Sequence, residues 1–295
     1  MSSLPATSLT ICSRNRPALL LDTVESVLRG EEVPTEIVIV DQSDKLHPIL
    51  PSLIFDRHCE IRYFWSQTVG VGRARNIALS EARHDLLILT DDDMFMESTW
   101  FGSLVRALCK AGPRTVVTGM VLQADGETTN GFAPSIKANQ MRAIYKGRIN
   151  QDVLYTGNMA MYRSVIDDIG LFDERLGAGA RFPAAYDNDF GYRLLEAGYH
   201  ILYAPESTVF HRAWRPDRDY ARLRWNYGRG QGAFYAKHLS LRDTYMLRRM
   251  IWDVVRRSIW LLLYLIRGHL QLAYGEFRYI HGTFSGASEW LRTQE

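Results

Sequence analysis

The sequence has few of the features that mark secreted, membrane-spanning or repetitive proteins. Only three of its 295 residues are cysteines, Cys12, Cys59 and Cys109, and their spacing is neither paired nor disulfide-dense. Such cysteines are typical of reduced thiols in a cytosolic protein. The longest uninterrupted apolar stretch, Ile259 to Ile266, has eight residues, whereas a bilayer-spanning helix needs about 20. Met1 to Thr7 lacks the pattern of a signal peptide. We therefore expect a cytoplasmic protein.

The chain also lacks a large net charge, which disfavours a polyanionic partner for the chain as a whole. Its 35 Lys and Arg residues against 33 Asp and Glu give a net charge of +2. Residues 212–295 hold 15 basic and 7 acidic residues, an excess of +8, so residues 1–211 carry −6. This asymmetry indicates different surroundings for the two parts. No recognised nucleic-acid-binding module accompanies the basic part, and we expect no nucleic acid partner.

Short apolar runs alternate with helix-period segments through the first half of the chain, which predicts β-α-β units and an α/β fold with a mostly parallel sheet. A long polar loop is expected over residues 124–152, since its texture is neither helical nor strand-like. The final strands are expected separately at 201–203 and 208–210. The strands predicted earlier in the chain are 9–12, 37–40, a weaker one at 61–64, 86–89, 116–122 and 159–162.

Acidic and polar residues follow several of these strands, where open α/β sheets bind ligands. Ser13 and Arg14 follow the first strand, Asp41 ends the second, and Asp91 to Asp93 follow the strand 86–89. Three adjacent carboxylates repel one another unless a cation compensates them. Mg²⁺ or Mn²⁺ would do so while bridging to phosphates, although a solvated turn with a helix-capping Asp would also explain the triplet.

Three further positions carry side chains suited to chemistry. Asp187 stands at a predicted helix start, where it is either a helix cap or a general base for a hydroxyl group. His211 closes the last strand, as a structural histidine or as a further metal ligand. Gly70 to Asn76 does not match the dinucleotide-binding pattern, yet a helix start flanked by Arg73 and Arg75 suits diphosphate oxygens.

Taken together, the motifs resemble those of the family 2 glycosyltransferases, enzymes of GT-A fold that use nucleotide-activated sugars. The similarity lies in the order and spacing of the motifs and covers about residues 8–212. The segment Ile37 to Ser43 resembles the family's V-V-D-D-G-S, and Leu86 to Asp93 resembles the strand that ends in its D-x-D motif. The other matching segments are 8–16, 72–79, 157–176, 187–198 (E-D-x-D-L-x-x-R-L) and 204–211.

The resemblance implies a role for each matching residue. Asp91 and Asp93 would hold Mg²⁺ or Mn²⁺ with His211 as a further ligand, and Asp187 would deprotonate the acceptor for in-line attack with inversion. The remaining positions are assigned to the donor or the acceptor: Cys12, Arg14, Asp41, Arg75 and Asp92 to the nucleotide, and Asn158 and Asp189 to the substrate.

Two departures from the family pattern matter. Tyr186 replaces the Glu that usually precedes the base, which leaves open whether Asp187 or Asp189 fills that role. Processive synthases carry Q-x-x-R-W and membrane-spanning helices, whereas Ala221 to Trp225 keeps Arg-Trp without the Gln. We therefore expect the transfer of a single sugar to a glycan or a lipid-linked acceptor. The alternatives are a nucleotidyltransferase of similar fold and a non-catalytic scaffold that binds sugar nucleotides.

We expect a GT-A catalytic domain over residues 1–212 and a helical, basic and aromatic extension over 213–295. At helical spacing, Leu247, Ile251 and Val255 fall on one face, whereas Arg249 and Arg256 fall on the other. This pattern predicts an amphipathic helix with a cationic polar face. The helix would pack on the catalytic domain, pair with a second copy in a homodimer, or lie on the anionic inner face of the cell membrane through residues 246–267.

Overall fold

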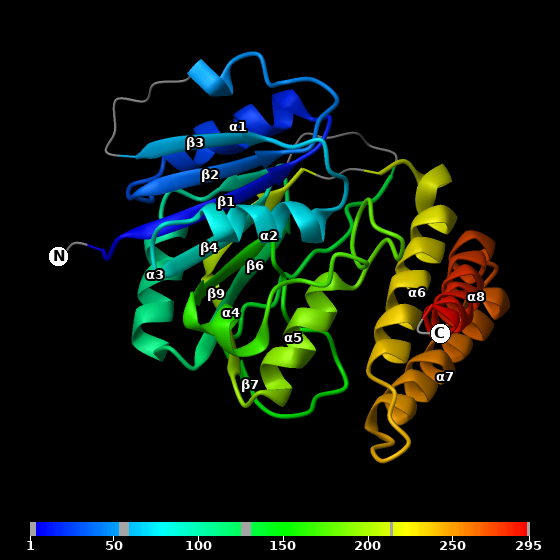
Figure 1. The fold of residues 1–295 in the computed structure, drawn as a ribbon. Helices are drawn as coiled ribbons and strands as arrows, with labels where there is room; N and C mark the ends of the chain where they lie inside the picture. The colour runs from blue at the N-terminus through cyan, green and yellow to red at the C-terminus, as the bar shows by residue number, and fades with distance from the viewer. Residues whose placement is uncertain (1–3, 53–58, 125–130, 213–214, 294–295) are drawn as a thin grey trace.

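A nine-stranded sheet forms the centre of the part of the chain that the structure describes (Figure 1). The structure is a computed structural model, which describes residues 4–52, 59–124, 131–212 and 215–293. In chain order the strands are β1 (Thr7–Ser13), β2 (Glu36–Asp41), β3 (Glu60–Trp65), β4 (Leu86–Asp91), β5 (Met94–Met96), β6 (Thr115–Gln123), β7 (Ala143–Tyr145), β8 (Asn158–Tyr162) and β9 (His200–His211).

The strands lie in the order β3-β2-β1-β4-β8-β6-β9-β5, and β7 pairs with β9. Strands β1 to β4 are mutually parallel, and β6 and β9 run in the same direction. Strands β5, β7 and β8 run in the opposite direction. The mostly parallel α/β sheet predicted from the sequence is therefore confirmed, with antiparallel β8 in the middle of the sheet and antiparallel β5 and β7 both paired with β9.

Helices cover both faces of the sheet, so that two hydrophobic cores form. The first lies between the sheet and α1 and α3 and includes Leu9 and Ile11 of β1. The second lies on the opposite face, against α4 and α5, and includes Leu87 and Leu89 of β4. The helices up to this point are α1 (Pro17–Leu28), α2 (Val71–Glu81), α3 (Trp100–Ala111), α4 (Ser164–Ile169) and α5 (Tyr186–Glu196), with a short 3-10 helix at Leu50–Ser52.

Two expectations about local structure were wrong. The segments 201–203 and 208–210 belong to one strand, β9, whose pairing with β6 is interrupted by a register shift between Gly119 and Met120. Within the expected loop 124–152, strand β7 forms and Lys137 pairs with Val121 in an isolated bridge; residues 125–130 lie outside the described part. Pairing with strands distant in sequence, rather than local periodicity, creates both features.

The extension is helical, as expected, and consists of α6 (Tyr220–Lys237), α7 (Tyr245–Ile266) and α8 (Leu270–Arg292), preceded by a 3-10 helix at Asp217–Asp219. Helices α6 and α8 approach so closely that only glycine fits at several crossing points. A Cβ atom on Gly228 or Gly232 would collide with the backbone carbonyls of Tyr279 or Thr283. The extension also shares a small core with the segment before α5, because Phe182 packs near Ala233 and Trp290. Residues 213–214, at the expected domain boundary, lie outside the described part.

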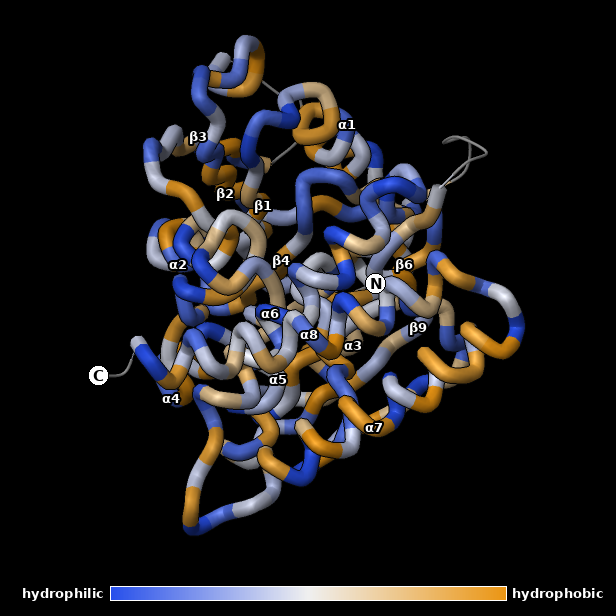
Figure 2. Tube along the Cα trace, turned by 90° about the vertical axis from the view of Figure 1, so that its right-hand side faces the viewer, coloured by the Kyte–Doolittle hydropathy of each residue, from blue (hydrophilic) through white to orange (hydrophobic). Residues whose placement is uncertain are grey.

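The orientation of α7 departs from that of an ordinary amphipathic helix. Its buried residues are Met246, Arg249 and Asp253, so part of the predicted cationic face turns inwards. Hydrophobic positions, orange in Figure 2, recur along α7. Many of the apolar side chains of this helix are exposed, as at Ile251 and Trp252. Among the described helices, none combines the length and the apolar character needed to cross a membrane.

Candidate active site

The polar clusters predicted to meet at the strand ends do meet. In the parallel pairing, Ser13 lies opposite Asp41 and Cys12 lies opposite Asp91. The same edge receives His211 at the end of β9. This edge of the sheet therefore brings together residues from three predicted clusters and His211, which lies more than a hundred positions after Asp93 in the chain.

A cavity of about 380 Å³ opens at this edge of the sheet. Its size falls within the range of small-molecule sites, about 300–1,000 Å³. Its polar and charged lining includes Cys12, Ser13, Arg14, Arg16, Gln42, Asp91, Asp92, Asp93, Ser135, Tyr155, Tyr186, Asp187, His211, Arg215 and Tyr227. The acidic triplet, the histidine and the predicted base therefore face the same space.

Arg16 compensates the charge of two carboxylates of the triplet. Its guanidinium lies 3.2 Å from Asp92 Oδ1 and 2.8 Å from Asp93 Oδ2. Ser13 Oγ donates a further hydrogen bond to Asp92 at 2.6 Å. Burial, followed by the negative charge of Asp93, nevertheless raises the pKa of Asp92 to about 6. The charges of the triplet are thus only partly compensated by Arg16.

Asp93 and His211 provide a carboxylate and an imidazole, two side-chain types that can act as ligands of a divalent cation. Asp93 Oδ1 lies 3.4 Å from His211 Nε2, and His211 Nδ1 lies 3.1 Å from the carbonyl oxygen of Pro134, which orients the ring. Burial opposes the charge on each group, but their contact lowers the pKa of Asp93 and raises that of His211. Among the described residues, no group of three or more His, Cys, Asp or Glu side chains is arranged to hold a metal. The pair therefore fits Mg²⁺ or Mn²⁺ if phosphate oxygens complete the coordination.

A buried arginine holds Asp91, the first residue of the triplet. Arg75 of α2 is fully buried, donates a hydrogen bond to Asp91 and lies with its guanidinium 5.7 Å from the centre of the Tyr186 ring. Tyr155 Oη lies 3.4 Å from the other oxygen of Asp91. The Asp91 side chain remains 26% exposed, so it stays accessible from the cavity. Arg75 therefore orients the Asp91 carboxylate without being part of the cavity lining itself.

Asp187 is positioned by the start of α5. Ala185 takes a left-handed backbone conformation (φ 67°) immediately before the helix, and the Asp187 carboxylate accepts a 3.0 Å hydrogen bond from the backbone N–H of Asn188. Burial raises the pKa of Asp187 to about 6, with Asp152 adding to the rise and Lys137 opposing it. A carboxylate with a pKa close to neutrality is suited to general base catalysis.

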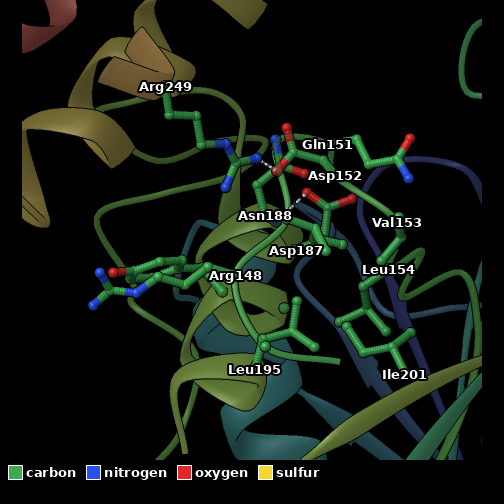
Figure 3. A pocket seen from close by; sticks show the side chains of 14 residues that line it. Arg148, Gln151, Asp152, Val153, Leu154, Asp187, Asn188, Leu195, Ile201 and Arg249 are labelled. Carbon is green, nitrogen blue, oxygen red and sulfur yellow. Dashed lines mark hydrogen bonds and ion pairs between the residues drawn. The ribbon is translucent and has the colours of Figure 1, made fainter. Parts of the chain in front are cut away.

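A second, much smaller pocket of about 10 Å³ lies behind Asp187 (Figure 3). Arg249 reaches into it from α7 and donates a hydrogen bond to Asp152. Gln231 of α6 bridges Asp152 and Asn188, through contacts of 3.3 Å and 2.7 Å. These contacts connect α6 and α7 to the start of α5, on which the predicted base stands.

Several predicted site residues do not line the main cavity. Asp41 is buried, and its oxygens accept hydrogen bonds from Ser43 and from Tyr63 Oη at 2.7 Å. Asn158 is buried and bonded to Trp100 and to two backbone carbonyls. Asp189 is fully buried, and its carboxylate lies 2.7 Å from Lys237 Nζ. In this structure all three hold strands and helices in place, and their predicted contacts with ligand stay predictions.

Cys12 and Arg14 do line the cavity, as predicted. Burial raises the pKa of the Cys12 thiol to about 12, so this thiol stays protonated at neutral pH. Arg14 is exposed at the rim. Three residues around the site were not predicted from the sequence. Arg16 lies two positions after Arg14, and the basic residues after the first strand were the available signal for it. Lys137 and Asp152 come from the segment expected to be a long loop, where no periodic pattern marks them.

Comparison with known proteins decides the family. The family model described as glycosyl transferase family 2 matches residues 8–170, more than half of the chain. The protein belongs to glycosyl transferase family 2. A pre-mycofactocin glycosyltransferase of Mycobacterium tuberculosis is 25% identical over 230 residues, which cover 76% of this chain and 46% of that protein. The hyaluronan synthase of Pasteurella multocida is 24% identical over 65% of this chain and 23% of its own length. The chain thus spans less than half of these relatives.

Solved structures share the GT-A fold. A mannosyltransferase from Pyrobaculum calidifontis, in complex with GDP-Man and Mn²⁺, superposes with a TM-score of 0.62 at 14% identity, over 100% of this chain and 89% of that one. GalNAc-T7 with UDP, GalNAc and Mn²⁺ gives a TM-score of 0.54 at 20% identity, over 72% of this chain and 44% of that one. At these identities the likeness shows the fold alone.

Proposed function

We propose that the protein is a metal-dependent, inverting glycosyltransferase that moves one sugar from a nucleotide-diphosphate sugar to a hydroxyl group of a glycan or a lipid-linked acceptor. One observation carries the proposal: Asp187 and the pair Asp93 and His211 line the same cavity at the carboxyl ends of the parallel strands. A general base and a place for a diphosphate therefore share one space of the size of a small-molecule site.

The chemistry assigned to each group follows from its position. Asp187 accepts the proton of the acceptor hydroxyl, whose oxygen forms a bond to the anomeric carbon. The bond from that carbon to the diphosphate breaks, and the diphosphate leaves with the electron pair. Asp93 and His211 would hold Mg²⁺ or Mn²⁺ together with phosphate oxygens of the donor, and we propose that Asp91, which Arg75 holds in this structure, joins them when the metal binds. The metal would stabilise the negative charge of the leaving group.

The groups around the triplet are proposed to position the donor. Arg16 and Ser13 fix the carboxylates of Asp92 and Asp93, and Arg75 fixes that of Asp91. Cys12 and Arg14 lie on the cavity wall at the end of β1, where the nucleotide is expected. Structural neighbours in complex with GDP-Man and Mn²⁺, and with UDP, GalNAc and Mn²⁺, support a nucleotide-sugar donor and a divalent metal. We further propose that the enzyme acts in the cytoplasm, where its three free cysteines would stay reduced.

The test is a transfer assay with a panel of nucleotide sugars, Mn²⁺ or Mg²⁺, and glycan and lipid-linked acceptors. Release of a nucleoside diphosphate, with an inverted linkage in the product, supports the proposal. Release of pyrophosphate would instead identify a nucleotidyltransferase. Metal-dependent binding of sugar nucleotides without turnover would identify a scaffold. Asp187→Asn should bind the donor as well as wild type does but lose roughly 10²- to 10⁴-fold in transfer rate.

A further inference from the structure

Exposed apolar residues line the outward side of α7 in the described part of the chain. Six of its residues form this surface, which we name the outer face: Leu247, Ile251, Trp252, Val255, Ile259 and Leu262, each exposed by more than two fifths. Exposed apolar residues continue through the turn at Gly268 into α8, at Leu270, Tyr274 and Phe277. Contiguous apolar patches of this kind mark interaction sites rather than ordinary protein surface.

The polar side of α7 is occupied by the protein itself. Arg249 is hydrogen-bonded to Asp152, and Arg257 lies 3.0 Å from Glu276 of α8 and against the Tyr279 ring. Asp253 is buried and within 3.3 Å of Tyr235 Oη. A helix that lies on a folded domain ordinarily buries its apolar side. These ion pairs hold α7 in the opposite orientation, so that its apolar side remains available to a partner.

The charges around the outer face identify the chemistry of that partner. Arg248 and Arg267 are exposed on α7 and at its end, and the Arg256 side chain is 52% exposed. Between residues 244 and 275 the sequence has one acidic residue, Asp253, and it points inwards. The outer face is therefore apolar and cationic, with no acidic group of its own.

A second copy of this chain is a poor match for such a surface. A symmetric dimer brings the same patch of both copies together, so the arginines of one copy would meet those of the other. An anionic lipid surface instead accepts apolar side chains between its headgroups and attracts arginines. Exposed tryptophans such as Trp252 and Trp260 have the amphipathic rings that favour the level of the headgroups.

We propose that the outer face of α7 binds the protein to an anionic lipid bilayer, with the helix lying in the plane of the surface. At 22 residues, α7 would extend about 33 Å along the membrane. The inference goes beyond the proposed function, because binding to lipid does not depend on the transfer reaction. With α7 on the bilayer, the C-terminal extension acts as a docking element that brings the cavity towards acceptors at a membrane.

The experiment is flotation of the full chain with phosphatidylcholine vesicles that contain or lack phosphatidylglycerol. We expect the wild-type protein to float with phosphatidylglycerol vesicles at low salt, less with pure phosphatidylcholine, and less at high salt. Arg248→Gln and Arg267→Gln should each weaken binding to the anionic vesicles about fivefold. The double variant Trp252→Glu, Ile259→Glu should lose binding to both kinds of vesicle.

Ile144→Glu is the matched control, because Ile144 of β7 is 59% exposed, much like Trp252 at 58% and Ile259 at 52%. It should float as wild type does. All variants should keep the wild-type melting temperature and rate of transfer to a soluble acceptor, since none of these side chains lines the cavity. Failure of the wild-type protein to float would overturn the proposal, as would an equal loss in Ile144→Glu. A stable dimer that Trp252→Glu, Ile259→Glu converts to monomers, without vesicle binding by wild type, would show that a second copy covers the face.

Discussion

Arg249 and Asp152, 97 residues apart, join the last part of the chain to the proposed catalytic base. Arg249 stands on α7, and Asp152 precedes β8 and raises the pKa of Asp187 through its negative charge. The C-terminal helices are therefore tied electrostatically to the start of α5. Changing charges in this group should alter how transfer depends on pH.

Transfer should fall as the pH drops through about 6, because Asp187 must be ionised to accept a proton and its pKa is raised to about 6. Asp152→Asn removes a neighbouring negative charge and should move this acidic limb to lower pH. Lys137→Gln removes a positive charge and should move it to higher pH. The profile of kcat/KM against pH measures both shifts, with the exposed Lys110→Gln as a control. Shifts of the same sign in the two variants would contradict the assignment of the base.

Removal of divalent metal by a chelator should abolish transfer, and added Mn²⁺ or Mg²⁺ should restore it. His211→Ala leaves Asp93 without its imidazole neighbour and should raise the metal concentration needed for half-maximal activity by at least roughly tenfold. The measurement is a titration of the metal-free protein with Mn²⁺, in which His84→Ala serves as the control. Undiminished transfer by metal-free wild-type protein would refute the metal dependence.

Asp189→Asn should destabilise the protein, whereas Asp187→Asn should not. Burial opposes the charge of Asp189, but His238, Lys237 and Arg193 outweigh it and lower its pKa. Breaking such a buried ion pair costs about 3 kcal/mol or more, which a urea unfolding curve would show. Because Asp187 has a raised pKa, the asparagine there removes a charge that the fold disfavours. Equal losses in both variants would contradict these contrasting roles.

The same Asp189 predicts a dependence of stability on pH. Folding lowers the pKa of Asp189. Its ionised carboxylate therefore contributes fully to the unfolding free energy at pH values above the pKa of the unfolded state, about 3.9, and this contribution is lost as the pH falls further. The unfolding free energy of the wild-type protein should therefore decrease below about pH 4. Asp189→Asn, already less stable at neutral pH, should show a smaller decrease over that range, as measured by urea unfolding at each pH.

Gly232→Ala should weaken the packing of α6 on α8. The new Cβ would collide with the backbone carbonyl of Thr283, which cannot move without displacing α8. Overpacking of this kind costs about 1–3 kcal/mol, and thermal unfolding would measure it. Ser288→Ala, at an exposed position of α8, is the control and should be nearly neutral. A Gly232→Ala protein as stable as wild type would contradict the close approach.

The sequence alone predicted the α/β class, the family and the meeting of the polar clusters at the strand ends. These follow from local causes: apolar runs form strands, and parallel strands bring the residues after them to one edge, so that Ser13 and Asp91 become neighbours. The order and spacing of the motifs indicated the family without reference to any tertiary contact.

The tertiary structure decided which of these residues face the cavity. Asp187 and Asp189 are two positions apart on the same helix, and only the packing of α6 shows that Asp189 is bonded to Lys237 while Asp187 lines the cavity. Arg16 likewise acquires its role from carboxylates that lie 76 and 77 residues away in sequence. Helical periodicity showed that α7 has an apolar side and a charged side. Its ion-pair partners, Asp152 far earlier in the chain and Glu276 on α8, decided that the apolar side faces outwards.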